Sequence, residues 1–157
     1  MVDREDADLN RSPIHLLHGA VQTAAAIFMQ HAAKLDLTPR QFAVLVIVDE
    51  NGGLNQTQIV ERTGIDRSTL SDVVRRLIHR GLLRRRRSND DARAYTVWLS
   101  DKGRRVLSEV EPAVAQADAA IQAVLSEAQR VELLQSLRAI IATSGTETAA
   151  RPKKRRT

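Results

Sequence analysis

The sequence predicts a mainly α-helical fold that carries one small β-hairpin. Long segments toward both ends of the chain have apolar residues at helical spacing, whereas only one short stretch, within residues 82–99, alternates with the period of a strand. A chain of 157 residues is long enough for one domain with extensions. Hydrophobic residues make up 43% of it and aromatic residues 3%, so the expected core is mostly aliphatic.

Caps and apolar patterns predict the first two helices. Residues 13–34 follow Ser12 as the N-cap, and the proline behind this cap suits a first helical turn. Thr38 caps a second helix, in which Gln41 completes a capping box. This second helix is apolar nearly all round, so it should be buried, and a Gly-Gly pair should end it.

The middle of the chain has the outline of a helix-turn-helix. A short helix should begin at Asn55 and end at Gly64, and a second should begin at Asp66 and end at Gly81. Two short helices joined by a tight turn that contains glycine form this motif. The pattern is common in helical proteins, so its interpretation depends on the segment that follows it.

An arginine-rich hairpin follows directly. Residues 82–87 read LLRRRR and are expected to be extended, and residues 95–99, YTVWL, alternate as a strand. The intervening SNDDARA is polar and turn-prone. A hairpin in this place, immediately after the second helix of a helix-turn-helix, is a wing.

Two further helices are expected after the hairpin. Ser100 should cap a helix over residues 101–125, and Ser126 should cap a last helix that ends near residue 143. Pro112 falls inside the first of them. Either that helix kinks at the proline or its boundary lies elsewhere.

Positive charge is concentrated in the helix-turn-helix and the hairpin. Residues 62–105 carry 13 basic and 5 acidic side chains, whereas residues 1–50 carry 4 basic and 7 acidic ones. Of the 24 basic residues in the chain, 20 are arginine, the side chain suited to bidentate contacts with phosphate and guanine. This local excess is typical of a surface that binds a polyanion.

The second helix of the motif offers a polar face opposite an apolar one. The candidate DNA contacts on it are Ser68, Thr69, Ser71, Arg75 and Arg76. The three hydroxyl residues lie near the N-terminus of the helix, which usually enters the major groove, so they are expected to read bases. The two arginines lie further along and could contact either bases or phosphates.

The hairpin supplies further candidate contacts. Arg93 lies at its predicted tip, where an arginine can enter a narrow minor groove. Asp91, two residues earlier, could hold that guanidinium in a fixed rotamer before DNA is bound. Phosphate contacts are expected from Arg67, Arg84 and Arg86.

Two motifs in this region are similar to those of a known family. They are STLSDVVRRLIHRGLLRRR, and DDARAYTVWLSDKG, which matches a D-x-R wing followed by L-[ST]-x-x-G. On these motifs, and on an element order that covers roughly residues 13–143, the chain resembles the MarR family of bacterial transcription regulators. Asp72 departs from the pattern, because many relatives carry arginine there, so a base or phosphate contact is in question at this position.

The resemblance implies a ligand-responsive regulator of transcription that binds double-stranded DNA, most often as a repressor. One recognition helix and one wing cover half a site, so a homodimer on a palindromic operator is implied, with an interface built from the first helix and the last two. The predicted organisation is a flexible N-terminus (1–12), a dimerisation helix (13–37), a winged helix-turn-helix DNA-binding lobe (38–100), dimerisation helices (101–143) and a disordered basic tail (144–157). The tail could contact phosphates, or it could simply be solvated.

The resemblance also implies an effector site. Relatives commonly bind small, anionic, often aromatic ligands between the dimer helices and the DNA-binding lobe. The segment TPRQFAVL resembles that of members controlling aromatic-acid catabolism, some of which sense coenzyme A thioesters. Alanines in the first helix could leave room for such a ligand. The candidate pocket residues are His15, His18 and Arg40 as polar anchors, and Phe42 and Trp98 as walls.

Other classes of function find little support in the sequence. Without cysteine, and without a phosphate loop or a zinc-protease or serine-hydrolase motif, we expect no enzyme, no catalytic residue and no cofactor. His15 and His18 have a spacing that can share a metal, but no cluster beside them completes a site. No apolar run is long enough to span a bilayer and the N-terminus is acidic, which favours a cytoplasmic protein that does not bind membranes. A non-specific, architectural DNA-binding protein remains the alternative, since arginine supplies affinity for any sequence.

Overall fold

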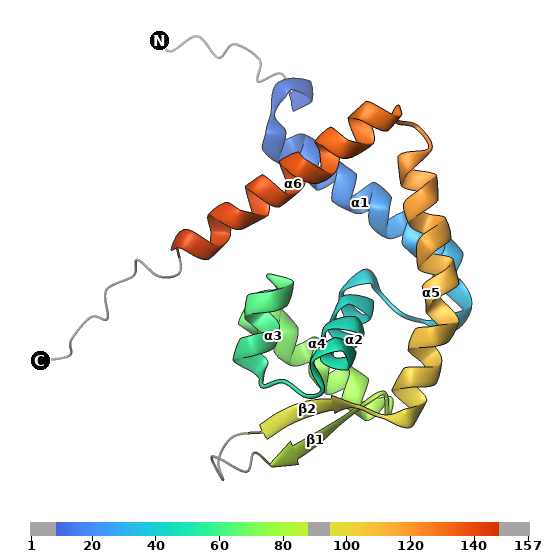
Figure 1. Cartoon of the computed structure of the whole chain (residues 1–157), viewed down its shortest axis with the longest axis vertical. Helices are drawn as coiled ribbons and strands as arrows, with labels where there is room; N and C mark the ends of the chain where they lie inside the picture. The colour runs from blue at the N-terminus through green and yellow to red at the C-terminus, as the bar shows by residue number, and fades with distance from the viewer. Residues whose placement is uncertain (1–8, 88–94, 148–157) are drawn as a thin grey trace, which may run out of the picture.

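The computed structural model describes residues 9–87 and 95–147 and has the predicted architecture, helices with one antiparallel hairpin (Figure 1). In chain order, the elements are η1 (Leu9–Arg11), α1 (Pro13–Ala32), η2 (Ala33–Leu35), α2 (Pro39–Asn51), α3 (Gln56–Thr63), α4 (Arg67–His79), β1 (Leu83–Arg87), β2 (Tyr95–Leu99), α5 (Asp101–Gln122) and α6 (Glu127–Glu147). The helix-turn-helix is α3 and α4, and the hairpin is β1 and β2. None of the helices in these two ranges is long and apolar enough to cross a membrane.

The predicted capping residues set the boundaries of the helices. The backbone N–H of Gln41 donates to Thr38 Oγ1 at 3.3 Å, and the N–H of Thr38 donates to Gln41 Oε1 at 3.0 Å. Asn55 and Gln58 form the same reciprocal box at the start of α3. Gly64 ends that helix in a left-handed conformation, with φ of 67°. The chain therefore enters and leaves each short helix through hydrogen bonds that satisfy the ends of its backbone.

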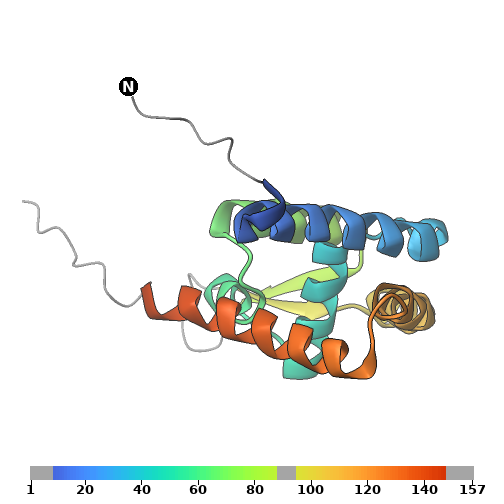
Figure 2. The same cartoon turned by 90° about the horizontal axis from the view of Figure 1, so that it is seen from above.

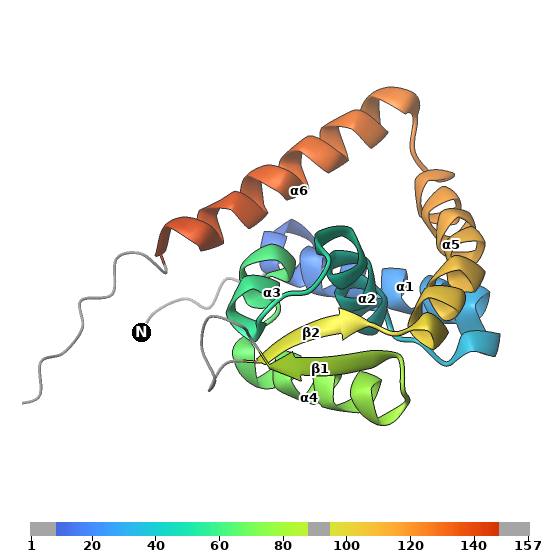
Figure 3. The ribbon, with the colours of Figure 1, turned by 60° about the horizontal axis from the view of Figure 1, so that its bottom comes forward.

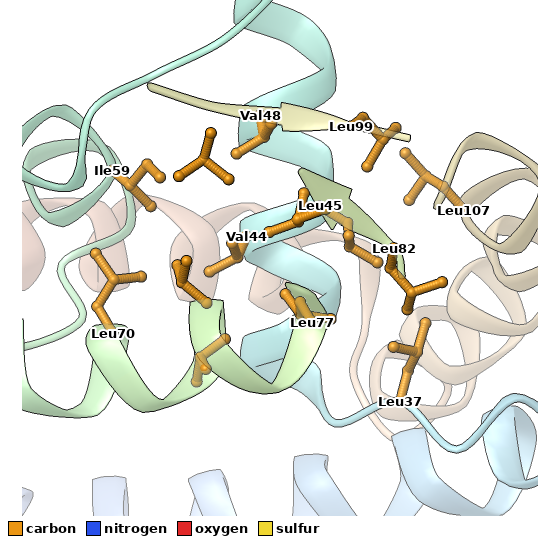
Figure 4. Packing of buried hydrophobic residues seen from close by; sticks show 14 of the residues in the cluster. Leu37, Val44, Leu45, Val48, Ile59, Leu70, Leu77, Leu82, Leu99 and Leu107 are labelled. Carbon is orange, nitrogen blue, oxygen red and sulfur yellow. The ribbon is translucent and has the colours of Figure 1, made fainter. Parts of the chain in front are cut away.

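One aliphatic core holds α2, α3, α4 and the hairpin together (Figure 4). Leu45 of α2, Ile59 of α3 and Leu70 and Leu77 of α4 are fully buried in it, together with Leu82 before β1. Because four separate elements each bury large aliphatic side chains in one cluster, the orientation of α4 relative to the hairpin is fixed by packing.

The hairpin turns one face to this core. Leu83 pairs with Leu99 and Arg85 with Val97, and these four residues lie on the same face of the hairpin. Leu83, Val97 and Leu99 are buried on this face. On the other side, Arg84 pairs with Trp98 and Arg86 with Thr96. A bridge between Leu54 and Val97 ties the hairpin to the end of α2.

The terminal helices form a frame beside the lobe. Helix α1 packs against α5, and α6 turns back at the end of α5 and runs across the molecule on the side opposite the hairpin (Figures 1 and 2). Helix α5 continues through Pro112 to Gln122, so the proline does not end it; its side chain is exposed, where water can reach the carbonyl that loses its partner.

Two boundaries differ from the sequence-based prediction. Helix α1 ends at Ala32, and the 3-10 turn η2 replaces its last expected residues. Helix α6 extends to Glu147, so residues 144–147 are helical and do not belong to a disordered tail. Residues 148–157, which include the basic tail RPKKRRT, lie outside the described residues.

Candidate DNA interface and the cavity beside it

Helix α4 lies beside β1 (Figure 3). Its exposed polar ridge is formed by Ser68, Asp72, Arg75 and His79. These side chains recur every three or four residues and so lie along one side of the helix. The opposite side is buried in the core through Leu70, Val73, Val74 and Leu77. The predicted division of this helix into an apolar and a polar face is therefore confirmed.

The start of α4 is fixed by hydrogen bonds to its cap. Asp66 accepts from the backbone N–H of Thr69 at 2.9 Å and from the hydroxyl of Ser68 at 2.6 Å. The hydrogen bond from Ser68, followed in size of effect by those from Thr69, holds the pKa of Asp66 well below its usual range. This carboxylate therefore stays ionised at the positive end of the helix dipole, where a negative charge is favourable.

Each candidate hydroxyl residue has its own environment. Ser68 is exposed on the ridge and keeps an oxygen that can accept from DNA. The Ser71 hydroxyl donates to the Arg67 carbonyl at 2.9 Å and lies 3.4 Å from Gln56 Oε1, so it is engaged against α3. Thr69 is half-buried and lines a cavity that borders α4.

The arginines of α4 also differ in their contacts. Arg67 donates from Nη2 to Thr57 Oγ1 of α3 at 3.0 Å, which links the two helices of the motif. Arg75 donates from Nη2 to Asp72 Oδ1 at 2.7 Å. Arg76 is exposed and lines the same cavity as Thr69.

The hairpin places Arg84 and Arg86 together on its outer face, as candidate phosphate contacts require. The guanidinium carbon of Arg86 lies 5.0 Å from the centroid of the Trp98 ring. Trp98 is thus part of the hairpin surface. Asp91 and Arg93, predicted for the tip, lie outside the described residues.

A cavity of about 870 Å³ lies between the terminal helices and the lobe. Its walls come from α1, α2, α4 and α5. The apolar side chains among them are Val21, Ala24, Ala25, Phe28, Met29, Pro39, Phe42, Val73, Val114, Ala117 and Ile121. Arg40 and Arg76 supply positive charge, whereas Asp72 and Asp118 supply negative charge. The arrangement suits a mainly apolar ligand, with charged groups of both signs at the border.

Comparison with known proteins shows the family to which the chain belongs. The model of the MarR family matches residues 37–95. The HTH-type transcriptional repressor NicR of Pseudomonas putida is 30% identical over 140 residues, which is 89% of this chain and 89% of NicR. The chain belongs to the MarR family. It is a DNA-binding transcription regulator of the winged helix-turn-helix type, as the sequence motifs indicated.

Two solved structures of MarR-type proteins show the same fold. BpsR of Bordetella bronchiseptica, whose DNA binding is regulated by 6-hydroxynicotinic acid, is 32% identical and superposes with a TM-score of 0.79, over 83% of this chain and 94% of BpsR. The repressor CouR, bound to a 23-mer DNA duplex, is 33% identical with a TM-score of 0.78, over 85% of this chain and 95% of CouR.

Of the pocket residues predicted for this MarR-family chain, Arg40 and Phe42 line the cavity and three others do not. His15 and His18 are exposed on the first half of α1, before the part that borders the cavity. Trp98 does not line the cavity; it lies on the hairpin and packs beside Gly53. Within residues 9–87 and 95–147, no three histidine or acidic side chains converge as they would around a metal ion.

The recognition helix α4 is itself a wall of the cavity, which the sequence did not predict. Thr69, Asp72, Val73 and Arg76 all border it. The helical spacing of these residues is visible in the sequence, but it does not reveal which other elements they face. Some side chains of α4 therefore face solvent and others face the cavity.

Proposed function

We propose that this protein is a repressor that binds a palindromic operator as a homodimer and is released by a small anionic aromatic ligand or its coenzyme A thioester. The observation that carries the proposal is the double role of α4. The same helix offers an exposed polar ridge and forms a wall of the cavity. A ligand in the cavity therefore contacts the element that meets DNA, which is the physical basis of a coupling free energy between the two sites.

Sequence-specific binding is supported by the placement of polar and basic groups. Helix α4 is held by the core on one side and leaves Ser68 and Arg75 exposed on the other. Arg84 and Arg86 on the hairpin add positive charge beside it. The ridge offers donors and acceptors for base edges in the major groove, and the hairpin offers cations for the backbone.

A homodimer is supported by the apolar surface of the terminal helices. Large hydrophobic side chains outside the cavity are exposed on α1 and α6: Ile14, Leu16, Val131, Leu133, Leu134, Ile140 and Ile141. Ile14 is 83% exposed and Ile141 is 67% exposed. A second copy of the chain would remove this surface from water, and it would supply the second recognition helix that a palindrome needs.

The ligand class is supported by the composition of the cavity. Phe28 and Phe42 pack with ring centroids 6.0 Å apart and offer an aromatic wall. Arg40 and Arg76 are the cations at its border. Next to the cavity, a groove of about 420 Å³ is lined by Arg75, Arg76, His79 and Arg80, together with Thr38, Gln41 and one carboxylate, Asp36. Its excess of basic side chains would suit the phosphates of a thioester form.

One relative supports the same ligand class, because the DNA binding of BpsR is regulated by 6-hydroxynicotinic acid, an aromatic acid. PcaV of Streptomyces coelicolor, 29% identical with a TM-score of 0.79, also binds a natural ligand, and the repressor CouR binds a DNA duplex.

Fluorescence anisotropy tests the proposal. The duplex upstream of the protein's own gene and a scrambled duplex would be titrated across a salt series. Tighter binding to the native duplex, reversed by an aromatic acid or thioester, is the expected result. Equal affinity for both duplexes would favour the architectural alternative, since charge alone does not discriminate sequence.

A variant in the cavity distinguishes an effect on ligand binding from an effect on DNA binding. Arg40 is on the border of the cavity and outside the ridge of α4. Arg40→Ala should therefore leave the affinity for operator DNA within about twofold, and it should weaken release by an acidic ligand about tenfold or more, as expected for loss of a charge-assisted hydrogen bond. If the ligand released Arg40→Ala and the unaltered protein from DNA equally well, Arg40 would not contact the effector.

A further inference from the structure

Asp72 is a carboxylate in the middle of a surface that is otherwise polar or basic. It is the one acidic residue in the segment Arg67–His79. Its neighbours along the exposed ridge are Ser68, one turn before it, and Arg75, one turn after it. The side chain of Asp72 is 58% exposed. The folded lobe therefore does not shield its carboxylate from a duplex that binds to the ridge.

A carboxylate in this place is unfavourable for DNA binding in general. Every duplex carries phosphates, and the negative charge of Asp72 repels them whatever the base sequence. The cost is smaller where the duplex offers a hydrogen-bond donor to the ridge, such as the amino group of cytosine. Asp72 therefore weakens binding to most DNA sequences, but it weakens binding much less where such a donor is present.

Asp72 also holds Arg75. The two side chains meet at 2.7 Å in an i, i+3 pair, while Arg75 remains 72% exposed. An exposed pair of this kind contributes little to the stability of the fold. Its effect is on geometry, because a guanidinium held by a carboxylate has fewer rotamers to lose when it meets a guanine in the major groove.

We propose that Asp72 is a positioning residue that sets the DNA sequence preference of this protein. It orients Arg75 toward guanine and weakens binding to duplexes that lack the matching base pair. The inference rests on the proposed function, because it requires that α4 reads base edges.

Selection from a random duplex pool tests the inference, and it does not require the operator sequence to be known. The unaltered protein, Asp72→Asn and Asp72→Glu would each be used to enrich and sequence bound duplexes, with Glu109→Gln as the control. Glu109 is exposed on α5, so its substitution changes net charge by the same amount at a distance from the ridge. Affinities for the enriched duplex and for a scrambled one would then be measured by anisotropy.

The expected result is a loss of selectivity in Asp72→Asn. The preference for one base pair in each half-site should relax, the affinity for scrambled DNA should rise, and the ratio of the two affinities should fall about tenfold, within the range for one base contact. Asp72→Glu, which can still pair with Arg75, should retain most of the preference. Arg75→Ala should relax the same base pair, and combining it with Asp72→Asn should add little further loss.

Two outcomes would overturn the inference, and they are distinguishable. If the unaltered protein enriches a motif and Asp72→Asn enriches the same motif with equal gains in affinity for all duplexes, Asp72 contributes only charge. If the unaltered protein enriches no motif at all, sequence reading itself fails, and the proposed function fails with it.

Discussion

Arg86 of β1 lies over the indole ring of Trp98 on the outer face of the hairpin, with its guanidinium carbon 5.0 Å from the ring centroid. Arg84 is the direct cross-strand partner of Trp98, so the two arginines flank one aromatic surface. The ring restricts Arg86 without removing it from solvent, since cation–π attraction at an exposed site is weak, about 0.5–1 kcal/mol. The hairpin therefore presents its positive charge on a defined surface.

Removal of this charge should weaken binding to all duplexes alike. Arg86→Ala should lower affinity for operator and scrambled DNA by similar factors and reduce the slope of log affinity against log salt by about 1, as expected for one lost phosphate contact. Arg138→Ala is the control, because Arg138 is on α6, which lies on the opposite side of the lobe from α4 and the hairpin (Figure 3). An unchanged salt slope in Arg86→Ala would show that this arginine does not meet a phosphate.

The turn after α2 depends on glycine because of Trp98. A Cβ on Gly53 would lie 2.3 Å from Cε2 of that ring, and φ at Gly53 is 107°. Gly53→Ala should therefore lower the free energy of unfolding by about 2 kcal/mol or more. In Gly19→Ala the added Cβ meets nothing within 4 Å inside α1, so stability should rise by about 0.5–1 kcal/mol. Urea unfolding followed by the fluorescence of Trp98, the single tryptophan of the chain, measures both.

Asp66 should make stability depend on pH in the acid range. Hydrogen bonds to Ser68 and Thr69 lower its pKa from 3.8 in the folded state. For a depressed pKa, the stabilisation is present above the unfolded value and is lost as pH falls through the folded one. The urea midpoint of the unaltered protein should therefore fall more steeply below about pH 4 than that of Asp66→Asn, which keeps a capping oxygen without a titrating charge. Parallel curves for the two proteins would contradict this role.

The exposed apolar face of α6 should control the oligomeric state. Leu134 is 45% exposed, so Leu134→Glu should leave the helical content of the single chain unchanged. If the face is a dimer interface, the buried charge should shift the protein toward monomer in sedimentation velocity. Gln135→Glu, an exposed neighbour on the same helix, adds the same charge and should stay dimeric. A Leu134→Glu protein that sediments like the parent would place the interface elsewhere.

Local signals in the sequence predicted the helices and the hairpin well. Thr38 with Gln41, and Asn55 with Gln58, start their helices through hydrogen bonds between residues three apart, which a sequence displays directly. The run of arginines and the strand period of residues 95–99 indicated the hairpin in the same way. These features depend on neighbours in the chain, and so they can be recognised before the fold is determined.

The cavity could not be predicted to the same extent. Its walls combine residues 21–29 of α1 with residues of α2, α4 and α5, and their relative placement depends on how whole helices pack. Helical spacing identifies an apolar side of α1 but not the half of it that borders the lobe. The prediction places room for a ligand beside alanines of the first helix, and Ala24 and Ala25 do line the cavity, but its polar anchors His15 and His18 lie before that part of α1. The aromatic character of Trp98 suggests a ligand wall, whereas its ring is used against Gly53 and Arg86.

Hydroxyl-radical footprinting on the duplex selected by the protein tests the central claim most directly, namely that two copies of α4 read two halves of one palindrome. The account predicts two protected half-sites related by two-fold symmetry, with centres about one helical turn of DNA apart, and loss of both in Leu134→Glu at the same protein concentration. A continuous footprint without symmetry, or a single half-site that Leu134→Glu protects equally well, would contradict it.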